Sequence, residues 1–166
     1  MKHLPYLLWM LLLVACSSID CPVDNVVQTQ YKVVRYDDSD FALPDSLSVT
    51  STKGDGRDTL LLNKLIAASK FTLPISYSHP EDVLVFHFDF ESDDSLIASV
   101  HEVDTVWVKK DDHPHFESVD CNATFFHTLT GVRCTHNYID SIVIKDPSVT
   151  FNDETIHFYL YPKSDD

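Results

Sequence analysis

Apolar residues recur at every second position in several short stretches of the chain, a pattern that predicts β-strands. Between residues 84 and 90, a leucine and three phenylalanines alternate with Val85, His87 and Asp89. The same period of two recurs at 139–143 and 156–160. No long apolar period of 3.6 residues occurs. The pattern therefore predicts an all-β protein.

Further strands are expected where β-branched and aromatic residues cluster between turn-forming residues. A single helical turn is expected at 65–69. The additional predicted strands span residues 31–36, 46–52, 58–63, 105–109 and 116–128. About eight short strands separated by turns are typical of an antiparallel β-sandwich, and we expect an immunoglobulin-like one.

The chain has only three glycines, and each lies where a hairpin is expected to turn. Residues 53–56 (Lys-Gly-Asp-Gly) are predicted to reverse the second strand into the third. Thr130 and Gly131 are predicted to form a two-residue turn, which places Cys134 opposite His127 and Cys121 opposite Asp140. In that register the two cysteines lie roughly 20 Å apart.

The N-terminus has the pattern of an export signal. A short basic start precedes an apolar run from Leu4 to Ala15, and twelve helical residues extend only about 18 Å, too short to cross a bilayer. Leu13-Val14-Ala15-Cys16 resembles a bacterial lipobox, which predicts acylation of Cys16 by palmitate-type chains. We expect a signal peptide at 1–15, a lipidated tether at 16–24 and one domain at 25–166.

Ser17 follows the cysteine, and no Asp occupies that position. By resemblance to lipoprotein sorting rules, this predicts the outer membrane, with either its periplasmic or its surface face open. The net charge of −14 disfavours binding to nucleic acid, because the chain repels phosphate. An apolar content of 44% at this charge indicates a folded domain and not a disordered one.

Besides the acylated Cys16 three cysteines remain, Cys21, Cys121 and Cys134, so one has no partner within the chain. Because the predicted register separates Cys121 from Cys134, a disulfide between Cys21 and Cys121 is the better expectation. It would join the end of the tether to the domain.

Five short segments of the chain form a recognisable set: Cys21-Pro22, residues 114–118 (Pro-His-Phe-Glu-Ser), Asp120-Cys121, residues 136–142 (His-Asn-Tyr-Ile-Asp-Ser-Ile) and residues 156–159 (Ile-His-Phe-Tyr). Together they resemble a family of lipoproteins of unknown function from Bacteroidetes-type bacteria. The resemblance implies a small secreted β-domain, and it supports the Cys21–Cys121 pair. It implies no activity.

Metal-binding patterns are weak in this chain. His113 and His115 point to one side of an extended strand, and Asp111, Asp112 and Glu117 are nearby, but no third ligand is placed. The acidic runs at 37–40 and 93–94 could bind calcium, although they lack EF-hand spacing and equally suit solvated loops. We expect no metal or other cofactor.

Hydrolase motifs are also absent, because three glycines cannot supply a nucleophile elbow or a phosphate-binding loop. His115, Glu117, His136 and Asp140 could meet on neighbouring strands as a polar site. The alternative is hydrogen bonding at a sheet edge. A metal-dependent or carboxylate-based hydrolase acting on envelope or glycan substrates is the second hypothesis for this protein.

The tripeptide Asp-Ser/Thr-aliphatic occurs five times and resembles the acceptor motif for protein O-glycosylation in the same bacteria. An Asp and a hydroxyl residue that simply open a strand are an equal alternative. The acceptor residues would be Ser46, Thr59, Ser95, Thr105 and Ser141.

The first hypothesis for function is a non-catalytic envelope module that is held to the membrane by its N-terminal lipid. It would bind a glycan or an envelope protein, or form part of a larger assembly. Such a module predicts exposed aromatic residues and no cleft lined by convergent ionisable groups.

Overall fold

The computed structural model describes residues 26–43, 46–52, 57–90, 100–118, 120–152 and 154–163. Ten strands and no helix lie within these ranges. They are β1 (Gln28–Val33), β2 (Ser46–Ser51), β3 (Thr59–Ile66), β4 (Lys70–Pro74), β5 (Glu81–Phe90), β6 (Val100–His115), β7 (Thr124–Cys134), β8 (Ile139–Ile144), β9 (Ser148–Val149) and β10 (Phe158–Pro162).

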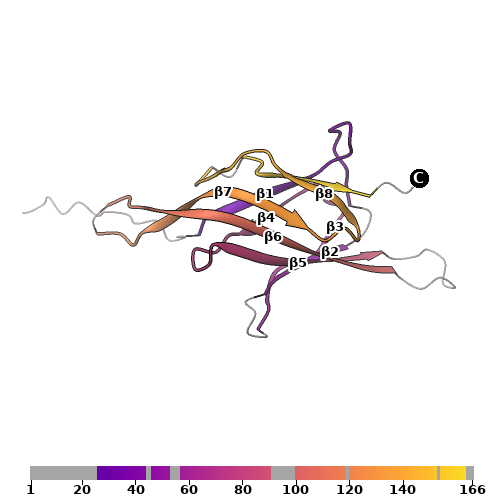
Figure 1. Ribbon diagram of the computed structural model, residues 1–166, viewed down its shortest axis with the longest axis horizontal. Helices are drawn as coiled ribbons and strands as arrows, with labels where there is room; N and C mark the ends of the chain where they lie inside the picture. Colours follow the sequence, from indigo (N-terminus) through magenta and orange to yellow (C-terminus); the bar gives the residue numbers. More distant parts are fainter. Residues whose placement is uncertain are drawn as a thin grey trace, which may run out of the picture.

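Two sheets pack together as a β-sandwich, which confirms the predicted fold class (Figure 1). One sheet has the order β4-β1-β10-β8 and the other the order β3-β2-β5-β6-β7-β9. The immunoglobulin-like variant is not confirmed by this order, because β5, β6 and β7 form a simple meander. Residues 1–24, which hold the predicted signal peptide and tether, lie outside the described residues.

Alternation along the strands builds the core. In β5 the even-numbered residues, from Asp82 to Phe88, are buried and the odd-numbered ones are half-buried. Tyr31 lies at the centre, where its ring stacks on Phe158 at 4.7 Å and on Phe71 at 5.1 Å. It also meets Phe86 of the opposite sheet edge-on at 6.1 Å. Aromatic rings therefore join the two sheets across the core.

The pairing is not antiparallel throughout. β1 and β10 pair in parallel, with Tyr31 opposite Phe158 and Val33 opposite Leu160. The expectation of a purely antiparallel sandwich is wrong at this pair. Parallel neighbours need a crossover connection, and here nearly the whole chain lies between the two strands.

The predicted turn at Thr130 and Gly131 is wrong, because β7 runs straight through both residues. Lys109 pairs with Gly131 and Lys110 with Leu129, so Thr130 is the extra residue of a β-bulge. A glycine inside a strand often marks such a bulge. The register derived from that turn, which placed Cys134 opposite His127, is also wrong, because Cys134 lies opposite Val106.

Strand β6 is much longer than predicted. It spans sixteen residues and ends at His115, and residues 116–118 and 120–123 are not in a strand. Pro114 is tolerated in β6 because, among the described residues, the strand pairs with β7 alone beyond Lys110, and its other edge needs no N–H donor there.

The helical turn expected at 65–69 is also wrong. β3 continues to Ile66, with a positive φ at Lys64 (46°) in the bulged stretch between Leu62 and Leu65. Ala67, with a φ of 51°, lies where the chain passes from β3 to β4 in the other sheet. The hairpin between β2 and β3 is confirmed by their antiparallel pairing, although residues 53–56 themselves lie outside the described residues.

Candidate functional site

Three tyrosines, one exposed and two half-buried, line the outer face of the four-stranded sheet. Because side chains alternate along β10, Tyr159 and Tyr161 point away from the core while Phe158 and Leu160 point into it. The Tyr161 ring stacks on Tyr36 at 5.4 Å, and it meets Tyr159 edge-on at 6.5 Å. Tyr36 is 63% exposed. We call Tyr36, Tyr159 and Tyr161 the tyrosine platform.

A tight loop after β1 holds Tyr36 in place. Val34 bridges to Asp40, the Arg35 N–H donates to the Ser39 carbonyl at 2.9 Å, and Asp38 adopts a left-handed φ of 60°. Such a turn projects residues 35–39 beyond the end of β1, next to the end of β10.

Hydrogen bonds fix the rims of the platform. The Tyr161 hydroxyl donates to the Asp38 carboxylate at 3.0 Å, and the Tyr36 hydroxyl donates to Asp140. The bond to Asp140, with some burial, raises the pKa of Tyr36. The rings are thus preorganised, and less conformational entropy is lost when a ligand binds them.

A pocket of about 350 Å³ opens beside Tyr36. Its walls are largely apolar, and the cationic side chains of Arg35 and Lys163 lie at its edge. The Arg35 guanidinium lies over the Phe41 ring at 4.9 Å, and the Lys163 ammonium donates to the His136 carbonyl at 2.7 Å. The lining residues are Arg35, Tyr36, Asp37, Phe41, Pro162 and Lys163.

Two lysines flank the other end of the platform. The ammonium of Lys145 lies 4.4 Å from the centroid of the Tyr159 ring, and that of Lys32 lies 5.8 Å from it. Lys32 also pairs with Asp40 at 2.6 Å. Flat aromatic faces with charged donors and acceptors around them can stack on the apolar face of a ligand and hydrogen-bond its hydroxyl groups.

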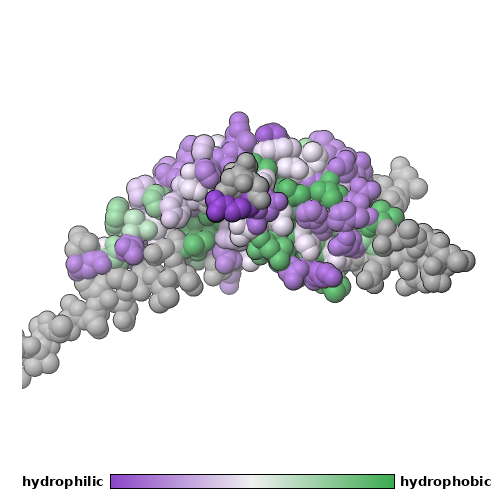
Figure 2. All heavy atoms as spheres, turned by 90° about the horizontal axis from the view of Figure 1, so that it is seen from below, coloured by the Kyte–Doolittle hydropathy of each residue, from purple (hydrophilic) through white to green (hydrophobic). Residues whose placement is uncertain are grey.

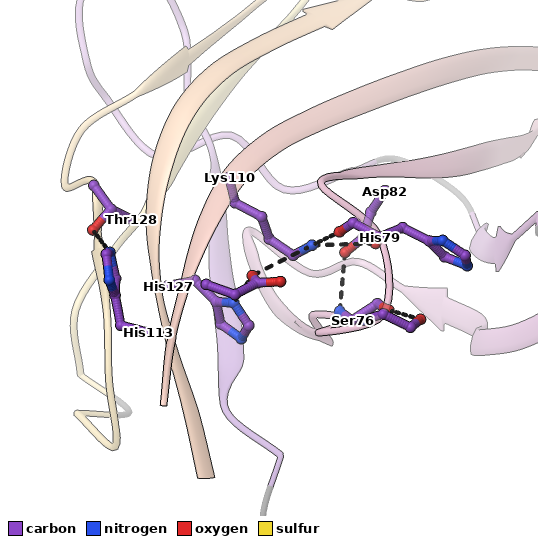
Figure 3. Close-up of polar contacts among 9 residues, drawn as sticks. Ser76, His79, Asp82, Lys110, His113, His127 and Thr128 are labelled. Atoms are coloured by element: carbon purple, nitrogen blue, oxygen red, sulfur yellow. Dashed lines mark hydrogen bonds and ion pairs between the residues drawn. The ribbon is translucent and has the colours of Figure 1, made fainter. Parts of the chain in front are cut away.

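A second group of ionisable side chains lies inside the sandwich, near its other end (Figure 3). The Lys110 side chain is fully buried, and its ammonium lies 3.7 Å from Asp82 and 3.8 Å from Asp112. It also donates to the His79 carbonyl. His127 lies 2.6 Å from Asp112 through Nδ1. Figure 3 shows Lys110 reaching between the strands toward Asp82 and His79.

Burial dominates the charges in this cluster. It raises the pKa of Asp82 and lowers the pKa of His127, because a desolvated group disfavours its charged form. The Asp82 side chain is 9% exposed and that of His127 is 2% exposed. A substrate has no direct access to groups so enclosed. Paired in this way, they serve the packing of the sheet, and removing one partner of such a pair typically costs about 3–5 kcal/mol.

The structure does not bring the four residues of the predicted polar site together. His115 Nε2 lies 3.2 Å from Glu117, and the His136 ring bonds the Asp140 carbonyl at 2.7 Å. The first pair lies where β7 begins and the second just after β7 ends, so about 30 Å of strand separates them. Asp140 contributes to the tyrosine platform instead, through Tyr36.

Asp104 has a role that the sequence did not indicate. It was predicted only as the opening residue of an acceptor motif at Thr105, yet it is fully buried. Its carboxylate accepts four hydrogen bonds, at 2.7–2.8 Å, from the Thr135 hydroxyl and the N–H groups of Asn137, Tyr138 and Ile139. This carboxylate holds the chain where it crosses from β7 to β8. The one available signal was an Asp on the inward-facing side of a strand.

The candidate acceptor residues differ in accessibility. Thr59 is exposed at the start of β3, and Ser46 is half-buried at the start of β2. Thr105 and Ser141 are half-buried within β6 and β8. Ser95 lies outside the described residues. O-glycosylation stays a prediction, with Thr59 as the most accessible of these acceptors.

Cys134 carries a free thiol. Burial raises its pKa to about 11, so it is almost entirely protonated at neutral pH and a poor nucleophile. Cys16 and Cys21 lie outside the described residues, and the Cys21–Cys121 disulfide stays a prediction.

The carboxylates of the acidic run at 37–40, which was a candidate calcium site, each bind a different partner. Asp37 accepts from the Ser39 N–H at 3.0 Å, Asp38 accepts from Tyr161, and Asp40 pairs with Lys32. Asp93 and Asp94 lie outside the described residues. The His113 ring contacts the Thr128 hydroxyl of the neighbouring strand β7 at 3.1 Å. Within the described ranges, no three His, Cys, Asp or Glu side chains are arranged to hold a metal ion.

A family model covers residues 46–162, which is most of the chain. The chain belongs to a family of unknown function, DUF6452. This confirms the resemblance to a domain of unknown function. No curated protein and no solved structure matches the chain. In the part of the chain that the structure describes, no helix is long and apolar enough to cross a membrane.

Proposed function

We propose that this DUF6452 protein is an outer-membrane lipoprotein of a Bacteroidetes-type bacterium whose β-sandwich is a non-catalytic glycan-binding module. The stack of the exposed Tyr36 ring on Tyr161, beside a pocket, carries the proposal. The Tyr36 ring is 63% exposed and lines the pocket, so a ligand in the pocket can contact it.

A glycan suits this site better than a protein partner does. A sugar ring has an apolar face of C–H groups that stacks on tyrosine, and its hydroxyls can bond Arg35, Asp37 and Lys163 at the pocket rim. A protein interface needs roughly 800 Å² from each partner, whereas the pocket beside Tyr36, at about 350 Å³, has the size of a small-ligand site. Figure 2 shows the opposite side of the domain, which carries the β2–β3 hairpin, and apolar residues there form separate patches among polar ones.

The enclosed ionisable cluster favours binding over catalysis. Catalytic acids and bases need access to a substrate as well as a shifted pKa. In the described part of the chain, the group with the most ionisable partners is the one around Lys110, and it lies within the core.

Anchoring is proposed on the sequence of residues 13–16, and the sandwich would be held there by a short tether with a Cys21–Cys121 disulfide. Mass spectrometry of the protein from native membranes tests it. Acyl chains on Cys16 as the first residue are expected, and an unmodified Cys16 would remove the anchor from the proposal.

Glycan binding can be tested by electrophoresis of the protein in gels that contain a soluble polysaccharide: a neutral glucan, a mannan or an acidic polygalacturonate. We expect at least one to retard the protein, and Tyr36→Ala to weaken that binding by about tenfold, which corresponds to the loss of about 1.4 kcal/mol of ring stacking.

Tyr77→Ala is the matched control, because Tyr77 is 59% exposed but lies at the other end of the domain. It should bind as the wild type does. Retardation by none of the polysaccharides, or equal loss in the two variants, would refute glycan binding at the platform.

A further inference from the structure

Exposed apolar side chains gather at the end of the sandwich where the described chain begins. They are Val26 before β1, Tyr77 after β4, Phe116 after β6 and Phe151 after β9, with exposed fractions of 52%, 59%, 62% and 41%. We call these four residues the basal patch.

Ring contacts tie the basal patch to strand β7. Tyr77 stacks on Phe125 at 4.8 Å, and Phe151 meets Phe126 edge-on at 5.0 Å. Since neighbouring residues of a strand point to opposite faces, Tyr77 and Phe151 lie on the two sides of the same hairpin. The Val27 carbonyl accepts from the Ile75 N–H, which keeps Val26 close to Tyr77. The patch therefore caps one end of the domain.

The predicted anchor is close to this end. Cys16 lies ten residues before Val26, and a fully extended chain of that length spans at most about 36 Å. Strand β6 alone is about 50 Å long, so the domain is longer than its tether. A tether of this length places the basal patch, and not the opposite end, next to the lipid. The proposed Cys21–Cys121 disulfide would shorten the free tether further.

The chemistry of the patch suits the surface of a bilayer. Tyrosine and phenylalanine rings favour the boundary between headgroups and acyl chains. Acyl chains and inserted aromatic residues would act as two membrane-binding signals on one molecule. Glu117, Asp120 and Glu154 are exposed nearby, so their carboxylates would stay hydrated and would repel anionic lipids.

We propose that the basal patch lies in the headgroup region of the membrane that holds the Cys16 anchor, so that the sandwich stands on its end. This rests on the proposed lipidation. Strand β1 leads away from Val26 toward Tyr36, and β10 runs parallel to it toward Tyr161 (Figure 1). The tyrosine platform would then face away from the lipid, toward glycans.

Tryptophan fluorescence in lipid vesicles can test this orientation with the full, acylated protein. Trp9 lies in the predicted signal peptide, so Trp107 is the one tryptophan of the mature chain. In a Trp107→Phe background, Phe116→Trp reports on the basal patch. Leu60→Trp is the control, because Leu60 is 55% exposed on β3, outside the patch. The vesicles contain phosphatidylethanolamine and phosphatidylglycerol, with or without bromine on the acyl chains.

We expect the Phe116→Trp emission to shift to the blue and to be quenched by brominated lipid, and the Leu60→Trp emission to be unchanged. More phosphatidylglycerol at low salt should weaken the quenching. A Phe151→Trp variant repeats the measurement if Phe116→Trp does not give the circular-dichroism spectrum of the wild type.

If the acylated protein binds vesicles but neither the Phe116→Trp nor the Phe151→Trp emission is quenched, the proposed orientation is wrong and the lipid anchor is still supported. Equal quenching at 60 and 116 would also overturn the orientation. Protein without acyl chains would instead refute the anchor, and the orientation with it. Intact mass, measured on the same sample, separates these outcomes.

Discussion

Replacement of Asp104 by alanine is expected to destabilise the domain more than the loss of a typical side chain. The carboxylate lies in the core and accepts four hydrogen bonds from residues 135–139. Alanine removes the acceptor but leaves the donors in place. Three of those donors are backbone N–H groups that have no freedom to turn elsewhere.

The magnitude follows from the number of donors. A buried donor without an acceptor costs about 1–3 kcal/mol, so three N–H groups imply a loss of at least about 3 kcal/mol. Domains of this size are stable by about 5–15 kcal/mol, and Asp104→Ala should therefore remove a large part of the total. Asp104→Asn should be more stable than Asp104→Ala but less stable than the wild type, because an amide offers one acceptor oxygen where the carboxylate offers two.

Urea unfolding followed by Trp107 fluorescence measures the change. Asp89→Asn is the matched control, since the Asp89 side chain is 44% exposed and pairs with the exposed His101 ring at 2.6 Å. We expect the control to change stability by less than about 0.5 kcal/mol. An Asp104→Ala variant within about 1 kcal/mol of the wild type would refute the reasoning, because it would show that water or a shifted chain satisfies the donors.

Two further predictions concern His157 and Gly131. Burial lowers the pKa of His157, whose Nδ1 accepts the Gln30 N–H at 2.9 Å and must therefore be unprotonated. The contribution of His157 to the free energy of unfolding should be fully present above about pH 6.5. It should fall as the pH drops toward the lowered pKa of the folded state, because the unfolded state takes up the proton first. His157→Asn should reduce the loss of stability between pH 7.5 and pH 5 in urea titrations, and an unchanged loss would contradict the prediction. A Cβ at Gly131 would meet only the Lys109 side chain, at 3.9 Å. Gly131→Ala should therefore stabilise the domain by roughly 0.4–1 kcal/mol and raise the midpoint of thermal unfolding. A lowered midpoint would mean that the bulge needs glycine.

Local patterns in the sequence determined the fold class and several of its strands. β2 and β8 begin at the predicted residues, Ser46 and Ile139. In β5 the alternation also identified the residues that face the core. These features depend on the period of two that every half-buried strand imposes, so they can be recognised without knowledge of the partner strand.

Tertiary structure decided what the same residue types do. Gly131 was expected in a turn, but pairing with β6 over the whole length of β7 makes it part of a bulge. A glycine permits either conformation, and only the neighbouring strand selects between them. The parallel pairing of β1 with β10 was equally hidden, since it joins residues more than 120 positions apart.

The candidate site shows the same division. Alternation in β10 was enough to place Tyr159 and Tyr161 on one face. The stack on Tyr36 and the pocket beside it depend on a loop from the other end of the chain. The burial of Lys110 and Asp104 likewise follows from which strands cover them. A sequence states the chemistry of each side chain and its place along its own strand, while contacts across strands arise only when the whole chain has packed.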